Sequence, residues 1–167
     1  AGVTVLDQGK LVTIKTKGRL NDLKEELKNY NLSGHVGIGH TRWATHGVPS
    51  NLNSHPHTNE ANTISIVHNG IIENYRELKA FLIEKGYQFH SQTDSEVIVH
   101  LLDYYYDGDM LKALQTVTNQ LEGSYALCIT STDMPDQVII TKKDSPLVVG
   151  QSDEGTYGAS DIPALLE

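Results

Sequence analysis

The spacing of apolar residues changes twice along this chain, and the order of those changes limits the folds open to it. Short alternating segments separated by turn residues occupy both ends, whereas residues 74–121 repeat apolar side chains every three or four positions. Alternation is typical of half-buried strands, and the longer spacing is typical of amphipathic helices. Strands that flank a block of helices favour an α+β fold over a doubly wound parallel sheet.

The strands are expected in short segments. Residues 3–6 and 11–15 predict a hairpin joined across DQGK, and a helix follows over roughly 19–30. Further strands are expected in these segments: GHVGIGH, TISIVHNG, SYALCITS, QVIITKK, PLVVG and GTYGAS. Cys128 lies inside one of them, which predicts a buried core thiol.

The helical middle carries start signals. Asn74 with Glu77, and Thr93 with Glu96, have the spacing of capping boxes and predict the starts of two helices. A third helix is expected from Asp109 to about Leu121.

Composition narrows the functional classes. A chain of 167 residues fits one domain, and its net charge of −8, with no Lys/Arg run longer than two, argues against nucleic acid or an anionic membrane as partner. No apolar run approaches the ~20 residues that span a bilayer. The single cysteine excludes a disulfide framework and predicts a cytoplasmic location.

Histidines gather in one part of the sequence. Six of the eight fall within 34 residues: His35, His40, His46, His55, His57 and His68. The pair in HPH has a spacing open to metal binding, but neither HExxH nor paired cysteines accompany it. Two interpretations stay open, a histidine-rich metal hydrolase and histidines that hydrogen-bond to the backbone in loops.

Three further features each have a structural and a functional interpretation. In HTRWATHG, Arg42 beside Trp43 among small residues predicts either a loop salt bridge or a recessed cation for an anionic ligand. Asn69-Gly70 is either a turn at the end of a strand or an oxyanion hole, made by the side-chain amide and the glycine N–H. Asp94 either interacts with a helix dipole or binds a cation. An amino acid with a scissile amide would use all three functional interpretations.

Three longer motifs carry a family resemblance: GIGHTRWATHGVPSNLNSHPH, VHNGIIENYRELK and SQTDSEVIVHLL. They resemble the glutaminase domain of the glucosamine-6-phosphate synthases, which are class II glutamine amidotransferases. The resemblance runs from the first strand to ASDIPALLE, so it covers residues 1–167 as a single domain. It implies an N-terminal-nucleophile hydrolase fold, a four-layer αββα sandwich with two antiparallel sheets between helix layers.

The resemblance also implies roles for the residues of the first motif. Arg42 would pair with the α-carboxylate of glutamine, and Thr45 and His46 would shape the same pocket. Trp43 would gate the passage of ammonia to its acceptor. His55 would lie near the glutamine pocket and orient groups there, with no metal bound.

The other two motifs supply the remaining roles. Asn69 and Gly70 match the oxyanion hole, and Asp94 matches the residue that holds the ammonium group of the substrate. The resemblance implies no cofactor. The expected reaction is hydrolysis of L-glutamine to L-glutamate and ammonia. In the complete protein, a homodimer, the ammonia would pass to fructose 6-phosphate at an isomerase domain.

One departure from the family pattern concerns the nucleophile. The family uses a cysteine as the first residue of the mature protein, with its own α-amino group as base, whereas residue 1 is Ala1. We therefore expect a domain truncated at its N-terminus, lacking the cysteine segment and the C-terminal sugar isomerase domains, and inactive by itself. A catalytically empty glutamine- or glutamate-binding module stays open as the alternative.

Overall fold

In the computed structural model, which describes residues 1–41 and 50–166, the first hairpin forms where the sequence predicts it. β1 (Gly2–Asp7) pairs antiparallel with β2 (Lys10–Lys15), and Gln8 and Gly9 between them have φ angles of 49° and 77°. Positive φ at both central residues is typical of a type I′ turn, whose twist matches that of the paired strands. β3 (Val36–His40) pairs with the other edge of β1, which gives a sheet in the order β2–β1–β3.

The second sheet has the order β4–β5–β6–β7, and each strand pairs antiparallel with the next. β5 and β6 form its centre and pair from Ile64↔Ser131 to Ile72↔Gly123. Alternate β6 side chains such as Leu127 and Ile129 are fully buried on one face, so this face of the sheet carries the main core. The bounds of the strands are β4 (His57–Thr58), β5 (Ile64–Ile72), β6 (Gly123–Ser131) and β7 (Ile139–Lys143).

The expectation of a turn at Asn69-Gly70 is wrong, because β5 continues through this pair to Ile72. Gly70 has a φ of 126°, yet it keeps its place opposite Tyr125 in β6. The Asn-Gly pair is a common turn signal. Here pairing with β6 on both sides of Gly70 holds the segment extended, and the glycine accommodates the local distortion.

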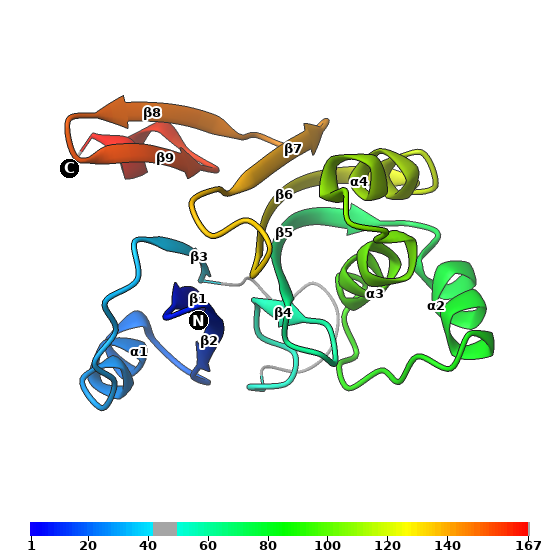
Figure 1. Cartoon of the computed structure of the whole chain (residues 1–167), viewed down its shortest axis with the longest axis horizontal. Helices are drawn as coiled ribbons and strands as arrows, with labels where there is room; N and C mark the ends of the chain where they lie inside the picture. The colour runs from blue at the N-terminus through cyan, green and yellow to red at the C-terminus, as the bar shows by residue number, and fades with distance from the viewer. Residues whose placement is uncertain (42–49, 167) are drawn as a thin grey trace.

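Helices cover the outer faces of the two sheets (Figure 1). α3 (Glu96–Tyr105) buries residues 97–102 in the main core, which α2 (Tyr75–Glu84) and α4 (Met110–Thr118) complete. On the other side α1 (Leu20–Leu27) buries Leu23 in a smaller cluster with Ile14 of β2. Among the described residues, no helix combines the length and the apolar character needed to cross a membrane.

The inner faces of the two sheets meet each other. Thr4 of β1 is fully buried, and its Oγ1 lies 2.9 Å from Ser65 Oγ of β5. The layers therefore run helix, sheet, sheet, helix, as expected for an αββα sandwich (Figure 1). The C-terminal part adds the hairpin β8 (Val148–Ser152) and β9 (Gly155–Ala159), followed by the 3₁₀ helix η1 (Ile162–Leu165).

Both predicted capping boxes are wrong. The Asn74 amide donates to Gln120 O and accepts from Glu122 N, so it fastens the start of α2 to the end of the helical block. Glu96 is the first residue of α3, and its carboxylate accepts from His90 N and Ser91 N in the preceding loop. Asp109 does cap α4, since its side chain accepts from Lys112 N.

Candidate functional site

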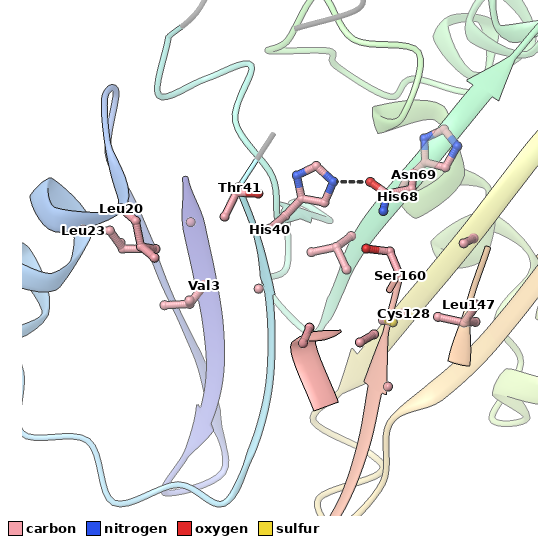
Figure 2. A pocket seen from close by; sticks show the side chains of 17 residues that line it. Val3, Leu20, Leu23, His40, Thr41, His68, Asn69, Cys128, Leu147 and Ser160 are labelled. Carbon is pink, nitrogen blue, oxygen red and sulfur yellow. Dashed lines mark hydrogen bonds between the residues drawn. The ribbon is translucent and has the colours of Figure 1, made fainter. Parts of the chain in front are cut away.

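A cavity of about 510 Å³ lies between the two sheets (Figure 2). Its lining comes from β1, α1 and β3 on one side and from β5, β6, β9 and η1 on the other. Most of the wall is apolar or glycine, and the polar groups are concentrated where β3 approaches β5. Four polar residues lie there, His40 and Thr41 on one side and His68 and Asn69 on the other, and Ser160 after β9 adds a hydroxyl to the wall.

Asn69 is held in place from the facing sheet. His40 Nε2, at the end of β3, lies 2.6 Å from Asn69 Oδ1 on β5. The next residue, Gly70, approaches β6 so closely that a Cβ added there would lie 2.1 Å from Ser124 O. The sequence therefore presents an amide side chain at the cavity wall, beside a main-chain segment that only glycine fits.

His55 lies next to His40 and is 5% exposed. The two rings stack with their centroids 4.4 Å apart and an interplanar angle of 23°. His55 Nδ1 accepts a hydrogen bond from the backbone N–H of His68, with an N···N distance of 3.2 Å. A backbone N–H can only donate, so Nδ1 carries no proton and the ring is neutral with its proton on Nε2.

Ser95 extends this proton order to a second histidine. Its Oγ lies 3.4 Å from His55 Nε2 and 2.8 Å from His68 Nδ1. Ser95 Oγ accepts from His55 and has one proton to donate. We assign that proton to His68 Nδ1, which places the proton of the His68 ring on Nε2. Burial lowers the pKa of the His68 imidazole, against the raising effect of the Asp94 carboxylate, which agrees with a neutral ring.

This assignment predicts an NMR result. With ¹⁵N-labelled histidine, His55 and His68 should each show a single neutral Nε2–H tautomer at pH 7. His35 is the internal control, because its ring is exposed and water can bond to either nitrogen. Changing Ser95 to alanine should leave the His55 tautomer in place and release that of His68. A protonated Nδ1 on His55 would contradict the assignment.

Asp94 contacts the same strand as Asn69, three residues further along. It is 2% exposed, and its Oδ2 accepts from Ile72 N at 2.8 Å. Asp94 lies two residues before α3, so the strand backbone is a direct partner of its carboxylate. It does not line the 510 Å³ cavity, and neither do Gly70 and His55.

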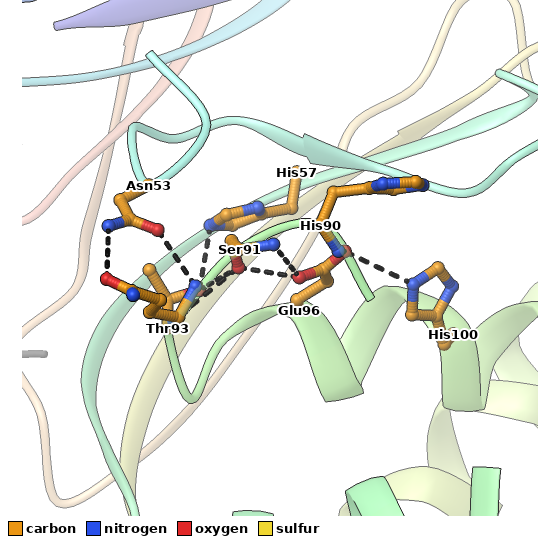
Figure 3. Close-up of polar contacts among 8 residues, drawn as sticks. Asn53, His57, His90, Ser91, Thr93, Glu96 and His100 are labelled. Atoms are coloured by element: carbon orange, nitrogen blue, oxygen red, sulfur yellow. Dashed lines mark hydrogen bonds and ion pairs between the residues drawn. The ribbon is translucent and has the colours of Figure 1, made fainter. Parts of the chain in front are cut away.

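A second series of hydrogen bonds runs from His57 to Glu96 (Figure 3). Ser91 Oγ donates to Glu96 Oε2 at 2.6 Å, because a carboxylate only accepts. Ser91 Oγ in turn accepts from Thr93 Oγ1 at 2.9 Å, and Thr93 Oγ1 accepts from His57 Nε2 at 3.1 Å. His57 packs edge-on against His55, with ring centroids 4.7 Å apart. Because the Glu96 carboxylate can only accept, it fixes which way the Ser91 and Thr93 hydroxyls donate, as far as His57.

Glu96 is almost fully buried, at 4% exposure, and the pKa of its carboxyl is nevertheless lowered. Burial by itself raises the pKa of its carboxyl, but the neighbouring His100 ring and the hydrogen bonds from His90 N and from the hydroxyl and N–H of Ser91 lower it to about 2. The His100 contact is 3.5 Å long, from Nε2 to Glu96 Oε1. Glu96 therefore fixes the loop that carries Thr93, Asp94 and Ser95.

The structure brings four of the predicted site residues into one region: His55, Asn69, Gly70 and Asp94. The other four predicted residues, Arg42, Trp43, Thr45 and His46, lie outside the described residues. Sequence reasoning missed His40 and Ser95 as partners of this region. His40 begins the HTRWATHG segment, which is a signal that could have found it, whereas nothing near Ser95 in the sequence marks its contact with two histidines.

Two other expectations can be compared with the structure. Cys128 is half-buried and lines the cavity, so the core thiol prediction is wrong; its β6 neighbours Leu127 and Ile129 occupy the core face instead. Burial raises the pKa of the Cys128 thiol. As for metals, no group of three His, Cys, Asp or Glu side chains in residues 1–41 and 50–166 could hold an ion.

Comparison with known proteins gives consistent matches. Residues 40–167 match the model of the family described as the glutamine amidotransferase domain. Glutamine–fructose-6-phosphate aminotransferases (isomerizing) from Clostridium acetobutylicum and Aquifex aeolicus are 55% and 45% identical to this chain over 166 residues. Those alignments cover 99% of this chain but only 27% and 28% of the relatives, so the chain spans about a quarter of their length.

Solved structures support the same fold. The glutamine phosphoribosylpyrophosphate amidotransferase from B. subtilis, complexed with ADP and GMP, superposes with a TM-score of 0.81 at 25% identity over 98% of this chain and 36% of that one. An allosteric regulatory enzyme of purine biosynthesis gives 0.85, with the same identity and coverage. The expected N-terminal-nucleophile hydrolase architecture and the α+β class are confirmed. The chain belongs to the glutamine amidotransferase domain family.

Proposed function

We propose that the chain is the glutamine-hydrolysing domain of an enzyme that makes glucosamine 6-phosphate from fructose 6-phosphate and glutamine. The observation that carries the proposal is the arrangement along β5. Asn69 presents its amide at the cavity wall, and Asp94 holds the same strand at Ile72. Three strand residues span about 10 Å. This span separates the strand position of Asn69 from the strand position that Asp94 contacts. Glutamine carries a side-chain amide at one end and an α-ammonium group at the other, one for each of these residues.

The proposed roles follow the chemistry of glutamine. The Asn69 amide and the Gly70 N–H would stabilise the oxyanion formed when the side-chain amide is attacked. Asp94 would bind the α-ammonium group. Arg42 would bind the α-carboxylate.

The other proposed roles concern the edges of the pocket. Thr45 and His46 would shape it, and Trp43 would gate the passage of ammonia. His55, through its stack on His40, would orient groups in the pocket without touching a metal. We further propose that the complete protein is a cytoplasmic homodimer in which ammonia passes to an isomerase domain. The family resemblance and the single cysteine support this part of the proposal.

Ligand binding by the 167-residue chain tests the site. We expect Asp94→Asn to weaken L-glutamine binding by about 10- to 150-fold in calorimetry, since a hydrogen bond to a charged group contributes about 1.5–3 kcal/mol. The variant keeps an oxygen for Ile72 N, so the strand contact survives. Glutaramate, which lacks the α-ammonium group, is the matched ligand and should bind equally to both proteins. Unchanged glutamine affinity in the variant would contradict the proposal.

A second candidate function is a module that binds glutamine or glutamate without hydrolysing it. The only thiol of the chain is Cys128, whose raised pKa makes it a poor nucleophile at neutral pH. We therefore expect the 167-residue chain to bind glutamine without sustained release of glutamate. The same assay on the full-length gene product separates the two functions: turnover supports the enzyme, and binding alone supports the module.

A further inference from the structure

The contact between His40 and Asn69 joins the two sheets at the cavity wall. His40 Nε2 comes from β3 and Asn69 Oδ1 from β5, 2.6 Å apart (Figure 2). Both residues line the cavity. The contact is therefore in a position to control which end of the Asn69 amide the cavity presents.

An asparagine amide has an accepting oxygen and a donating nitrogen on the same carbon. With Oδ1 bonded to His40, the NH₂ group is turned away from the histidine (Figure 2). An amide flipped by half a turn would offer its oxygen to a developing oxyanion and repel it. His40 holds the amide with its NH₂ group free for the oxyanion only when His40 Nε2 carries a hydrogen. A His40 Nε2 without a hydrogen would accept from the NH₂ group and so favour the flipped amide.

The His40 ring is itself held in place by His55. It stacks on His55, whose Nδ1 is fixed by the backbone N–H of His68 and whose Nε2 faces Ser95. His55 is neutral in this arrangement, so the stacked ring places no positive charge against His40. The backbone N–H of His68 in β5 thus fixes the His55 ring, and His55 supports the His40 ring. His40 in turn orients the amide of Asn69, which also belongs to β5.

We propose that His40 is a positioning residue that fixes the Asn69 amide as an oxyanion donor. The inference rests on the proposed function, because it gives Asn69 a role only if an oxyanion forms in the cavity. His40 acts through Asn69 and does not touch the substrate. Its contribution belongs to the transition state, so it should affect kcat and leave KM nearly unchanged.

The kinetic test is a double-mutant cycle in the full-length protein with glutamine hydrolysis as readout. His40→Phe keeps a flat ring for the stack on His55 but removes the N–H. We expect kcat to fall by about 10²-fold, with KM for glutamine within about threefold. Asn69→Ala should lower kcat by about 10²–10³-fold, and adding His40→Phe to it should cost no more than about twofold further.

Two variants act as controls. His40→Gln places an amide N–H at a similar reach and should recover at least tenfold of the loss in His40→Phe. His35→Phe, an exposed histidine replaced in the same way, should have the kinetics of the unchanged protein. Effects of His40→Phe and Asn69→Ala that multiply in the double variant would overturn the proposal, as would a loss confined to KM.

A spectroscopic arm separates this proposal from the proposed function. In the 167-residue chain, the two proton resonances of the Asn69 side-chain NH₂ should lie away from the positions of a freely solvated asparagine, shift toward those positions in His40→Phe and return in His40→Gln. If full-length protein does not hydrolyse glutamine, the proposed function fails, while these resonances still decide whether His40 orients the amide. Unchanged Asn69 resonances in His40→Phe would overturn the positioning role whatever the kinetics.

Discussion

Replacing Glu96 with alanine is expected to lower the free energy of unfolding by about 3–5 kcal/mol, as removing one partner of a buried charged group does. Three donors lose their acceptor: His90 N, Ser91 N and the Ser91 hydroxyl. Each buried donor left without a partner costs about 1–3 kcal/mol. Urea unfolding of the 167-residue chain, followed by circular dichroism, measures the change.

The matched controls are Glu84→Ala and Glu96→Gln. Glu84 is exposed at the end of α2, so its loss should change stability by no more than about 0.5 kcal/mol. Glu96→Gln keeps one accepting oxygen and should fall between the two alanine variants. A Glu96→Ala protein as stable as Glu84→Ala would contradict the role assigned to this carboxylate.

The pH dependence of stability follows from the same group. The pKa of the Glu96 carboxyl is about 2 in the folded chain, against 4.5 as its ordinary value. Because the folded pKa is the lower one, the stabilisation is complete above about pH 4.5 and is lost as the pH falls toward 2. The stability of Glu96→Gln should therefore fall less steeply than that of the unchanged chain between these pH values.

Gly70→Ala is expected to have an effect of similar size for a different reason. Its Cβ would lie 2.1 Å from Ser124 O and 2.9 Å from Tyr125 Cα, and both are backbone atoms of β6 that cannot turn aside. The φ of 126° adds strain that a residue with a side chain rarely tolerates. Overpacking and backbone strain each cost about 1–3 kcal/mol, so we expect a loss of about 2–6 kcal/mol in the same urea experiment.

Gly155→Ala is the control for this substitution. Gly155 also lies in a strand, but its nearest neighbours to an added Cβ are atoms of the Tyr157 ring at 3.7–3.9 Å, and its φ is not positive. Its replacement should change stability by less than about 1 kcal/mol. If Gly70→Ala were equally mild, β5 and β6 would have to separate without cost, and the main chain at Gly70 would not be held as described.

Local periodicity was sufficient to predict most of the elements. The hairpin β1–β2, the strand β3 and the helix α4 form where apolar spacing and turn residues predict them. These elements depend on neighbours close in sequence, and short-range physics is visible in a single chain. The α+β class followed from their order along the chain.

The errors occur where a distant partner overrides a local signal. Asn69-Gly70 has the composition of a turn but is held extended by β6, more than fifty residues away in sequence. The capping pattern at Asn74 gives way to backbone partners at Gln120 and Glu122. A local pattern states which conformation a segment favours when isolated, and not which partner the tertiary fold supplies.

The site shows the same division. Asn69, Gly70 and Asp94 were predicted from their chemistry and a family resemblance, whereas their convergence on β5 depends on tertiary structure. His40 was missed as a partner of Asn69 because 29 residues separate them. Histidine clustering alone could not show which rings stack and which bind hydroxyls, since both outcomes depend on strand register.

The donor that sets the tautomer of His55 is the peptide N–H of residue 68. Every amino acid except proline supplies that group, so alanine scanning of position 68 would remove the imidazole and leave this donor untouched. Evolutionary substitution at this position is equally unable to report on it. Chemical ligation with an ester in place of the amide linking residues 67 and 68 would remove this N–H donor. A changed His55 tautomer in that protein would show that the path of the main chain, and not the identity of residue 68, sets the protonation state of the ring.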